Sequence, residues 1–220
     1  SIIPAKESIK KLIRLRATEP ALVNALGYAQ KHSVRKALKH FKDSEVITNK
    51  LVFKLIKNGM KIYTHCHSST VVDALIYAKK KGKKFGVFNT ETRPLLQGRK
   101  TAGELARAGI NVTMVVDSAA MQAIKNSDMM IIGADAVLSD GSVINKIGSG
   151  LFSQIAHDFK KPVYIATDSW KFSGKNVKIE EEVWRELAKE KIERNLQRIS
   201  DVIKEKSIIS KKFVNEKEFI

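Results

Sequence analysis

The fold of this chain is decided by one stretch of its sequence, Lys61-Ile62-Tyr63-Thr64-His65-Cys66-His67-Ser68-Ser69. It begins with a short apolar run typical of a strand, and four apolar residues then follow at helical spacing, Val71, Val72, Leu75 and Ile76. The stretch predicts a strand that ends beside Cys66 and a helix that begins just beyond it. A thiol at this junction faces the amide groups of a helix N-terminus, which favour a thiolate and bind anions. Cys66 is therefore placed where chemistry could use it.

Composition favours a globular protein with one sizeable core. The chain has 220 residues, of which 43% are hydrophobic, enough for one core domain or for a core domain with a small appendage. A single cysteine excludes an internal disulfide framework, and no stretch approaches the roughly 20 apolar residues of a membrane span. The N-terminus has no long apolar block, so we expect no signal peptide and a cytoplasmic location.

The charge is strongly basic and uneven. The formal net charge is +17; residues 1–60 hold 13 basic and 4 acidic side chains, whereas residues 171–220 hold 13 and 10. One interpretation is a basic N-terminal face that binds RNA or an acidic protein. The other is a solvated, lysine-rich surface. The second is favoured, because no aromatic residues are interleaved with these charges as a stacking surface requires.

Hydrophobic periodicity divides the chain into two predicted parts. Residues 1–59 form a helical N-terminal segment, with apolar faces at Ile9 to Ile13, Ala21 to Ala29, Val34 to Phe41 and Val46 to Ile56. Pro20 suits a first helical turn. From residue 60 the period changes, and residues 60–220 are predicted to form an α/β domain. Beyond Lys171 the sequence predicts a helix from Glu180 to Arg194 and an extended segment from Ser207 to Val214.

Strand-like and helical runs alternate in the second part. Short apolar runs rich in branched or aromatic residues lie near 62–63, 85–88, 112–116, 129–132 and 163–166, and helical stretches lie near 70–81, 101–108, 118–125 and 149–159. This alternation predicts a Rossmann-like parallel sheet with helices on both faces. Ligands then bind at the carboxyl ends of the strands.

Polar residues follow every predicted strand and form the candidate site. They are Cys66, Asn89-Thr90-Glu91-Thr92-Arg93, Asp117-Ser118, Gly133-Ala134-Asp135 and Thr167-Asp168-Ser169. For Asp117 and Ser118 an ordinary helix N-cap is an equally good interpretation. The convergence of these residues on one edge of the sheet is stronger evidence for a binding site than any single residue among them.

The sequence predicts neither a cofactor nor a metal. Gly148-Ser149-Gly150 lacks the third glycine of a dinucleotide-binding loop, and no Walker-type loop occurs. On an extended strand end, His65 and His67 would point to the face opposite Cys66 and could not share a metal with it. One of them could orient a substrate, but a hydrogen-bonded structural role is favoured for at least one.

Five blocks of sequence carry a resemblance to a known family. They are residues 64–68, 88–98, 112–119, 133–136 and 145–148, with a fainter similarity at Pro20 to Leu26. Together they resemble the translation initiation factor 2B alpha/beta/delta family, which includes the archaeal ribose-1,5-bisphosphate isomerases and the methylthioribose-1-phosphate isomerases. The five blocks occur in the same order as in the family, through residues 61–172, about half of the chain. They are specific for the family but do not show to which of its branches the chain is most similar.

The resemblance implies a function and a set of site residues. In the isomerases, residues matching Cys66 and Asp135 form the catalytic pair that converts an aldose phosphate into a ketose. A thiol and a carboxyl group in a dry pocket suit that hydrogen transfer and ring opening. The substrate-binding residues implied are Gln97, Lys146, Arg93, Asn145, Gly148 and Ser149, with backbone amides of the 148–150 turn, which opens a helix, beside the phosphate. The alternative for Cys66 is a small buried hydrophobic residue.

Two departures from the isomerase pattern predict weaker phosphate binding. The Arg-Gly-Ala segment of the isomerases has no match here, where 65 residues precede Cys66, and Glu19 replaces the arginine that precedes the proline matching Pro20. The alternative is a non-catalytic regulatory subunit that binds initiation factor 2 or RNA through the basic N-terminal face. A third is a scaffold whose pocket is vestigial. The resemblance also implies a homodimer or a higher oligomer, and no membrane partner.

Overall fold

A parallel sheet forms the centre of the fold. The computed structural model describes Ile9 and residues 19–173, so the predicted helix at 180–194 and extended segment at 207–214 lie outside the described residues, as does most of the helical segment predicted around Ile9 to Ile13. Of the described helices, none combines the length and the apolar character needed to cross a bilayer.

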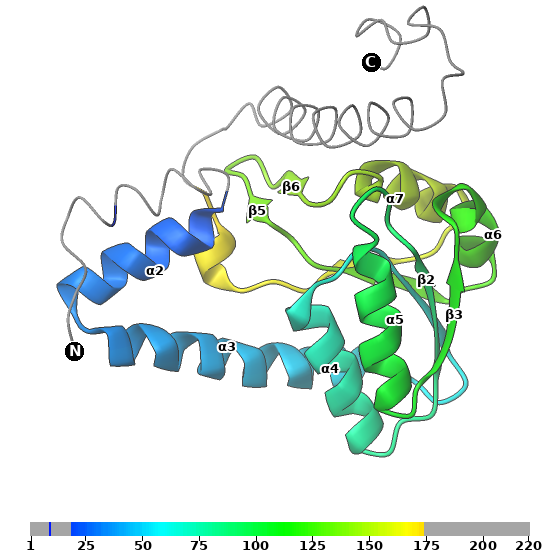
Figure 1. Ribbon diagram of the computed structural model, residues 1–220, viewed down its shortest axis with the longest axis horizontal. Coiled ribbons are helices and arrows are strands. Elements are labelled where there is room, and N and C mark those ends of the chain that lie inside the picture. Colours follow the sequence, from blue (N-terminus) through cyan, green and yellow to red (C-terminus); the bar gives the residue numbers. More distant parts are fainter. Residues whose placement is uncertain (1–8, 10–18, 174–220) are drawn as a thin grey trace, which may run out of the picture. The chain divides into compact units, whose positions relative to one another are not determined.

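Five strands pair in the order β3-β2-β1-β4-β7, and all neighbours are parallel (Figure 1). Their bounds are β1 Lys61–Thr64, β2 Gly86–Thr90, β3 Asn111–Val115, β4 Met129–Ile132 and β7 Val163–Ile165. Tyr63 lies opposite Phe88 on one side and Met130 on the other. The strand order reverses at β1, so the edge between β1 and β4 is a topological switch point, where α/β sheets bind ligands. The predicted Rossmann-like α/β fold is confirmed.

Helices cover both faces of the sheet (Figure 1). One core packs α4 (Ser69–Lys80) and α5 (Gln97–Arg107) against side chains such as Ile62 and Ile131, and the other packs α6 (Ala120–Lys125) and α7 (Ser149–Asp158) against Tyr63 and Met130. Ile62 and Tyr63, which are neighbours in β1, therefore pack into the cores on opposite faces of the sheet, as the alternation of side chains along a strand requires. A 3₁₀ turn, η1 (Asp117–Ala119), precedes α6.

The helical N-terminal segment contains α2 (Pro20–Lys31) and α3 (Val34–Leu55). Pro20 occupies the start of α2, as predicted, and the Ser33 hydroxyl caps α3 by accepting from the Lys36 amide at 3.2 Å. The sequence predicts separate apolar faces at Val34 to Phe41 and Val46 to Ile56, and in the structure a single helix, α3, runs through both and through the segment 42–45 between them. That segment has no glycine or proline, so the helix continues through it.

Aromatic contacts attach α2 and α3 to the segment after β7. The Trp170 ring, in the 3₁₀ turn η2 (Ser169–Lys171), stacks on His40 at 3.8 Å between ring centroids and contacts Tyr28 and Phe41. Asn24 Nδ2 also donates to the carbonyl oxygen of Trp170 at 2.7 Å. These contacts link both N-terminal helices to the same end of the sheet. The division into residues 1–59 and 60–220 stays a prediction.

A small antiparallel hairpin was not predicted. It consists of β5 (Ala136–Val137) and β6 (Val143–Ile144), joined by a turn in which Gly141 adopts φ 85° and the Ser142 amide donates to Asp140 Oδ1 at 2.9 Å. Strands of two residues are too short for an alternating pattern to show in the sequence. The hairpin is relevant to the site because it brings Asp135, at its start, beside residues 145–148, at its end: the Asp135 amide donates to the Ile144 carbonyl at 2.7 Å.

Candidate functional site

Four of the predicted site residues lie at the carboxyl edge of the sheet, around the switch point. Cys66 follows β1, and Asp135 follows β4, the strand hydrogen-bonded to β1. Gln97 begins α5, which follows β2, and Lys146 follows β6. Four residues far apart in the sequence thus lie around the end of the central strand.

Cys66 is buried and has an unusual backbone conformation. Its φ is 67°, in the left-handed region, so the extended strand end assumed from the sequence is wrong at this residue. Its amide donates to Thr92 Oγ1 at 3.0 Å, and its carbonyl oxygen accepts from Thr101 Oγ1 at 2.8 Å. The Sγ atom lies 3.5 Å from Gln97 Oε1. Non-glycine residues are held in this conformation mainly where the surrounding structure determines it, and they cluster at functional sites.

The thiol of Cys66 is held in its protonated form. Burial raises its pKa, and the negative charge of Asp135 raises it further, whereas the His67 amide and the positive charge of Lys146 lower it. Burial is the largest of these effects, so the expectation that a helix N-terminus favours a thiolate here is wrong. The helix α4 begins beyond the thiol, at Ser69, and the Ser68 hydroxyl accepts from an amide of its first turn. The charges of Asp135 and Lys146 therefore act on the pKa of the same thiol in opposite directions.

Both neighbouring histidines are hydrogen-bonded within the fold. His65 is buried, with Nδ1 2.7 Å from Thr90 Oγ1 and Nε2 2.9 Å from the Ile147 carbonyl oxygen. His67 Nδ1 lies 3.1 Å from Thr101 Oγ1. Burial lowers the pKa of both imidazoles. The prediction that at least one of them is a structural histidine is confirmed, and His65 also ties the end of β1 to the loop that precedes α7.

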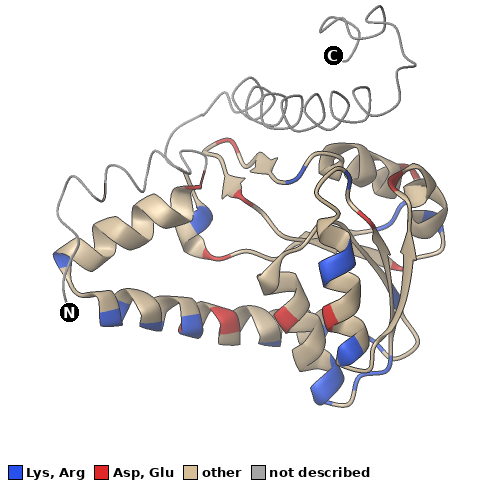
Figure 2. Ribbon diagram, in the orientation of Figure 1, with Lys and Arg blue, Asp and Glu red and all other residues tan. Residues whose placement is uncertain are grey.

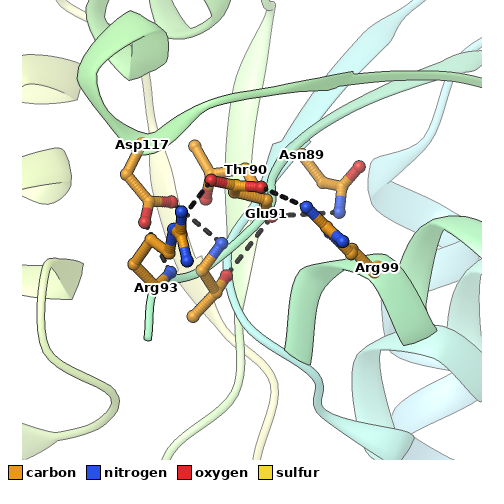
Figure 3. Close-up of polar contacts among 7 residues, drawn as sticks. Asn89, Thr90, Glu91, Arg93, Arg99 and Asp117 are labelled. Atoms are coloured by element: carbon orange, nitrogen blue, oxygen red, sulfur yellow. Dashed lines mark hydrogen bonds and ion pairs between the residues drawn. The ribbon is translucent and has the colours of Figure 1, made fainter. Parts of the chain in front are cut away.

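Asp117 holds the loop that follows β2. Its carboxylate accepts from the amides of Thr92, at 2.9 Å, and Arg93, at 2.5 Å, as Figure 3 shows. It therefore does not cap its own helical turn, which was the alternative interpretation of the sequence. Its partners lie about 25 residues earlier in the chain.

The side chain of Arg93 is engaged with Glu91. Glu91 lies between two arginines in Figure 3, with Oε1 3.2 Å from Arg93 Nε and Oε2 3.0 Å from Arg99 Nη2. The Glu91 side chain is only 12% exposed, whereas those of Arg93 and Arg99 are 67% and 56% exposed. Arg93 therefore lies at the surface of this edge, in a position where an anion would compete with Glu91 for it.

The segment 145–149 connects the hairpin to α7. Asn145 Nδ2 donates to Ser149 Oγ at 2.9 Å, and Gly148, at φ 95°, precedes the first residue of the helix. The prediction that the 148–150 turn opens a helix is thus confirmed. A side chain at Gly148 would approach His65 Nε2 to 3.3 Å and Phe152 to 3.1 Å.

Two features of the site differ from the sequence-based expectation. Asp135 is exposed in the described part of the chain, whereas the chemistry implied by the family resemblance suits a dry pocket. Thr92, whose hydroxyl holds the Cys66 amide, belonged to the candidate polar run but was given no role of its own, and Thr101, which also holds Cys66, was not among the predicted site residues. The only signal for Thr92 was its place in the polar run after β2, and Thr101 had none, because it lies within a helix. Among Ile9 and residues 19–173, no three His, Cys, Asp or Glu side chains gather in a way that could hold a metal ion.

The sequence matches the Initiation factor 2 subunit family over residues 6–213, nearly the whole chain. The chain belongs to this family. The family resemblance found in the five sequence blocks is thereby confirmed.

Relatives in the family carry two kinds of name. A ribose 1,5-bisphosphate isomerase of Archaeoglobus fulgidus is 34% identical over 200 residues, covering 82% of this chain and 64% of the relative. The translation initiation factor eIF2B subunit alpha of Dictyostelium discoideum is 38% identical over 125 residues, covering 57% of this chain and 39% of the relative. The chain thus spans less than two thirds of the length of these relatives.

Solved structures share the fold. The translation initiation factor eIF-2B of Pyrococcus horikoshii superposes with a TM-score of 0.75 at 26% identity, over 78% of this chain and 66% of that one. The 5-methylthioribose 1-phosphate isomerase of the same organism has a TM-score of 0.56 at 25% identity, over 78% of this chain and 52% of that one. The family fold is therefore shared by factors and isomerases.

Proposed function

We propose that this chain is an aldose–ketose isomerase that acts on a phosphorylated pentose of the ribose 1,5-bisphosphate or methylthioribose 1-phosphate type. The observation that carries the proposal is the placement of Cys66 and Asp135 after hydrogen-bonded strands at the switch point, with the charge of Lys146 acting on the same thiol. The isomerase names among the family relatives support it.

The chemistry of the reaction suits this pair. To open the sugar ring, a proton must reach the ring oxygen as its bond to C1 breaks; to form a ketone, hydrogen must move from C2 to C1 and the C2 hydroxyl must lose its proton. Cys66 keeps its proton because burial raises the pKa of its thiol, so it supplies the proton for ring opening. Asp135 accepts the proton from the C2 hydroxyl, since a carboxylate is the natural acceptor beside a protonated thiol.

The remaining predicted residues would bind the substrate. Gln97 lies 3.5 Å from the thiol and can hold a sugar hydroxyl beside it. Lys146, Arg93 and the amides at the start of α7 offer positive charge and donors for phosphate. Asn145 and Gly148 shape that helix start, and Ser149 begins it. Glu19, in place of an arginine, is expected to lower phosphate affinity.

Turnover of the two sugar phosphates by the purified protein, followed by phosphorus NMR, tests the proposal. The variants Cys66→Ser and Asp135→Asn should each lower kcat by about a hundredfold or more, the range typical of a positioned acid or base. Their thermal unfolding midpoints should stay close to that of the unaltered chain. Absence of turnover together with absence of a thermal shift on adding either sugar phosphate contradicts the proposal.

The second candidate is a regulatory subunit that binds initiation factor 2 or RNA. The relative named eIF2B subunit alpha favours it, as do the basic residues that recur along α3 in Figure 2, among them Arg35, Lys39 and Lys42. Charge reversal at Arg35 and Lys39 should then weaken binding of the partner, and reversal of Lys80, on α4, should not. Unchanged binding and salt dependence in the α3 variants contradicts this function.

We also propose that the chain is cytoplasmic and self-associates as a homodimer or a higher oligomer. The support is a set of exposed large apolar side chains on the edge strand β3, in the loops beside it and at the start of α6, which are 44% to 56% exposed, namely Leu95, Met114, Val116 and Met121. Light scattering on the purified chain measures its mass. Substituting Met114 and Val116 by lysine should lower that mass if this edge is the contact.

A further inference from the structure

A chain of hydrogen bonds crosses the carboxyl edge of the sheet from β3 to β1. Asp117, after β3, accepts from the amides of Thr92 and Arg93, after β2. Thr92 Oγ1 in turn accepts from the amide of Cys66, after β1, at 3.0 Å. The three strands are neighbours in the order β3-β2-β1, so each residue acts on the end of the next strand.

Cys66 depends on this support because of its backbone conformation. A left-handed φ of 67° is unfavourable for a residue with a side chain, and at this position it is combined with burial. A buried amide must also have an acceptor. The Thr92 hydroxyl supplies that acceptor, and Thr92 is itself fully buried.

Thr92 needs support of the same kind. Its φ is 61°, also left-handed, and it is followed by the exposed Arg93. Because the Asp117 carboxylate takes the amides of both residues, it determines the course of the loop at the point where the Thr92 hydroxyl turns toward Cys66. Two strained residues in neighbouring loops are thus held by one carboxylate.

We infer that Thr92 and Asp117 are positioning residues for the thiol of Cys66. Asp117 sets the loop, Thr92 holds the Cys66 amide, and Cys66 in its left-handed conformation places Sγ beside Gln97. As positioning residues for isomerisation they rest on the proposed function, but their control of the thiol is measurable without it. Cys66 is the single cysteine of the chain, so any thiol reagent reports on this residue alone.

The test compares alkylation of the full chain by iodoacetamide across pH in three variants. Thr92→Val keeps the shape of the side chain and removes the hydroxyl, Asp117→Asn leaves one acceptor for two amides, and Thr92→Ser restores the hydroxyl. We expect Thr92→Val to raise the alkylation rate roughly fivefold or more, because the Cys66 amide loses its acceptor and the residue leaves its buried position. Thr92→Ser should stay within about twofold of the unaltered chain, since it keeps that acceptor.

We infer that Asp117 acts on the thiol through Thr92, and the alkylation rate of the double variant tests this order of action. If Asp117 acts on the thiol only through Thr92, the double variant should alkylate at the rate of Thr92→Val alone, instead of at the product of the two effects. In the isomerase assay, both single variants should lower kcat by about tenfold to a hundredfold and change KM by less than about threefold, because a reacting group displaced by about 1 Å loses that much rate.

A matched control lies at the other end of β1. Asp128 Oδ2 accepts from the Lys61 amide at 2.7 Å, so Asp128→Asn removes a carboxylate–amide contact from the same strand, far from the thiol. It should change neither the alkylation profile nor kcat. The inference is overturned if the alkylation profiles of Thr92→Val and Asp117→Asn match that of the unaltered chain. It is also overturned if Asp128→Asn changes the alkylation profile as much as they do. If the unaltered chain has no isomerase activity, the proposed function fails, and the alkylation rates still decide the positioning role.

Discussion

The Nε2 atom of His65 donates a hydrogen bond of 2.9 Å to the carbonyl oxygen of Ile147. Because a carbonyl can only accept, Nε2 carries the proton, and Nδ1 accepts from the Thr90 hydroxyl at 2.7 Å. Burial lowers the pKa of the imidazole and so favours its neutral form, with the proton on Nε2, and the ring joins the end of β1 to the loop before α7. This contact sets the place of Gly148 and hence the start of the helix nearest the predicted phosphate site.

The stability of the fold should depend on pH through His65. Burial lowers the pKa of this imidazole below its ordinary value of 6.5, so in acid the unfolded chain takes up a proton that the folded chain does not. The contribution of the neutral His65 to the free energy of unfolding is therefore fully present above about pH 6.5. This contribution is lost as the pH falls below that value and through the lower pKa of the folded state. Thermal unfolding at pH 7.5 and 5.5 measures the loss.

The variant His65→Gln separates this effect from other titrations. It should lower the free energy of unfolding at pH 7.5 by about 1 to 3 kcal/mol, through impaired buried hydrogen bonds. Its further loss between pH 7.5 and 5.5 should be smaller than that of the unaltered chain. Parallel pH profiles for the two proteins would show that His65 is not the group responsible.

Gly98 is required by the approach of α5 to β2. A Cβ at this position would lie 1.7 Å from the Thr90 carbonyl oxygen, a backbone atom that cannot move aside cheaply. Gly98→Ala should therefore destabilise the fold by about 3 kcal/mol or more. In the same helix, a Cβ at Gly103 meets nothing closer than Arg107 Nη1 at 3.5 Å. Gly103→Ala should stabilise by about 0.5 to 1 kcal/mol, and urea unfolding of the pair checks the contrast.

Charge changes at Lys146 and Asp135 should move the pKa of the Cys66 thiol in opposite directions. Lys146 lowers this pKa and Asp135 raises it. Lys146→Met should thus slow alkylation by iodoacetamide at pH 8, and Asp135→Asn should accelerate it, because the thiolate is the reactive form. The midpoint of the pH–rate profile measures each shift. A shift of the same sign in both variants would mean that these charges do not act on the thiol.

The ion pairs of Glu91 should contribute little to stability. Both arginine partners are more than half exposed, so Glu91→Gln is expected to lower the free energy of unfolding by about 1 kcal/mol or less, with the difference shrinking in 1 M NaCl. The same variant releases Arg93 and should tighten binding of inorganic phosphate, measured by calorimetry. Unchanged phosphate binding would remove Arg93 from the predicted site.

Local sequence patterns were sufficient where an element is formed by its own residues. The strands β1, β2, β3, β4 and β7 were predicted because each is a short apolar run bounded by polar residues, although the edge strands β3 and β7 are only partly buried. The start of α2 at Pro20 and the helix opened by Gly148 were predicted from single residues with strong conformational preferences. The β5–β6 hairpin was missed because strands of two residues leave no periodic signal.

The sequence by itself determined the sheet, its covering helices and the residue types at the carboxyl edge, because apolar period and strand-end polarity are local properties of the chain. Only the tertiary structure decided how those residues act. The pKa of Cys66 follows from burial by segments distant in the sequence, and it is raised where the local pattern predicted a thiolate. Asp117 holds Thr92 and Arg93 instead of capping its own turn, because β2 and β3 are neighbours in the sheet. Contacts of this kind depend on strand order, which no local pattern specifies.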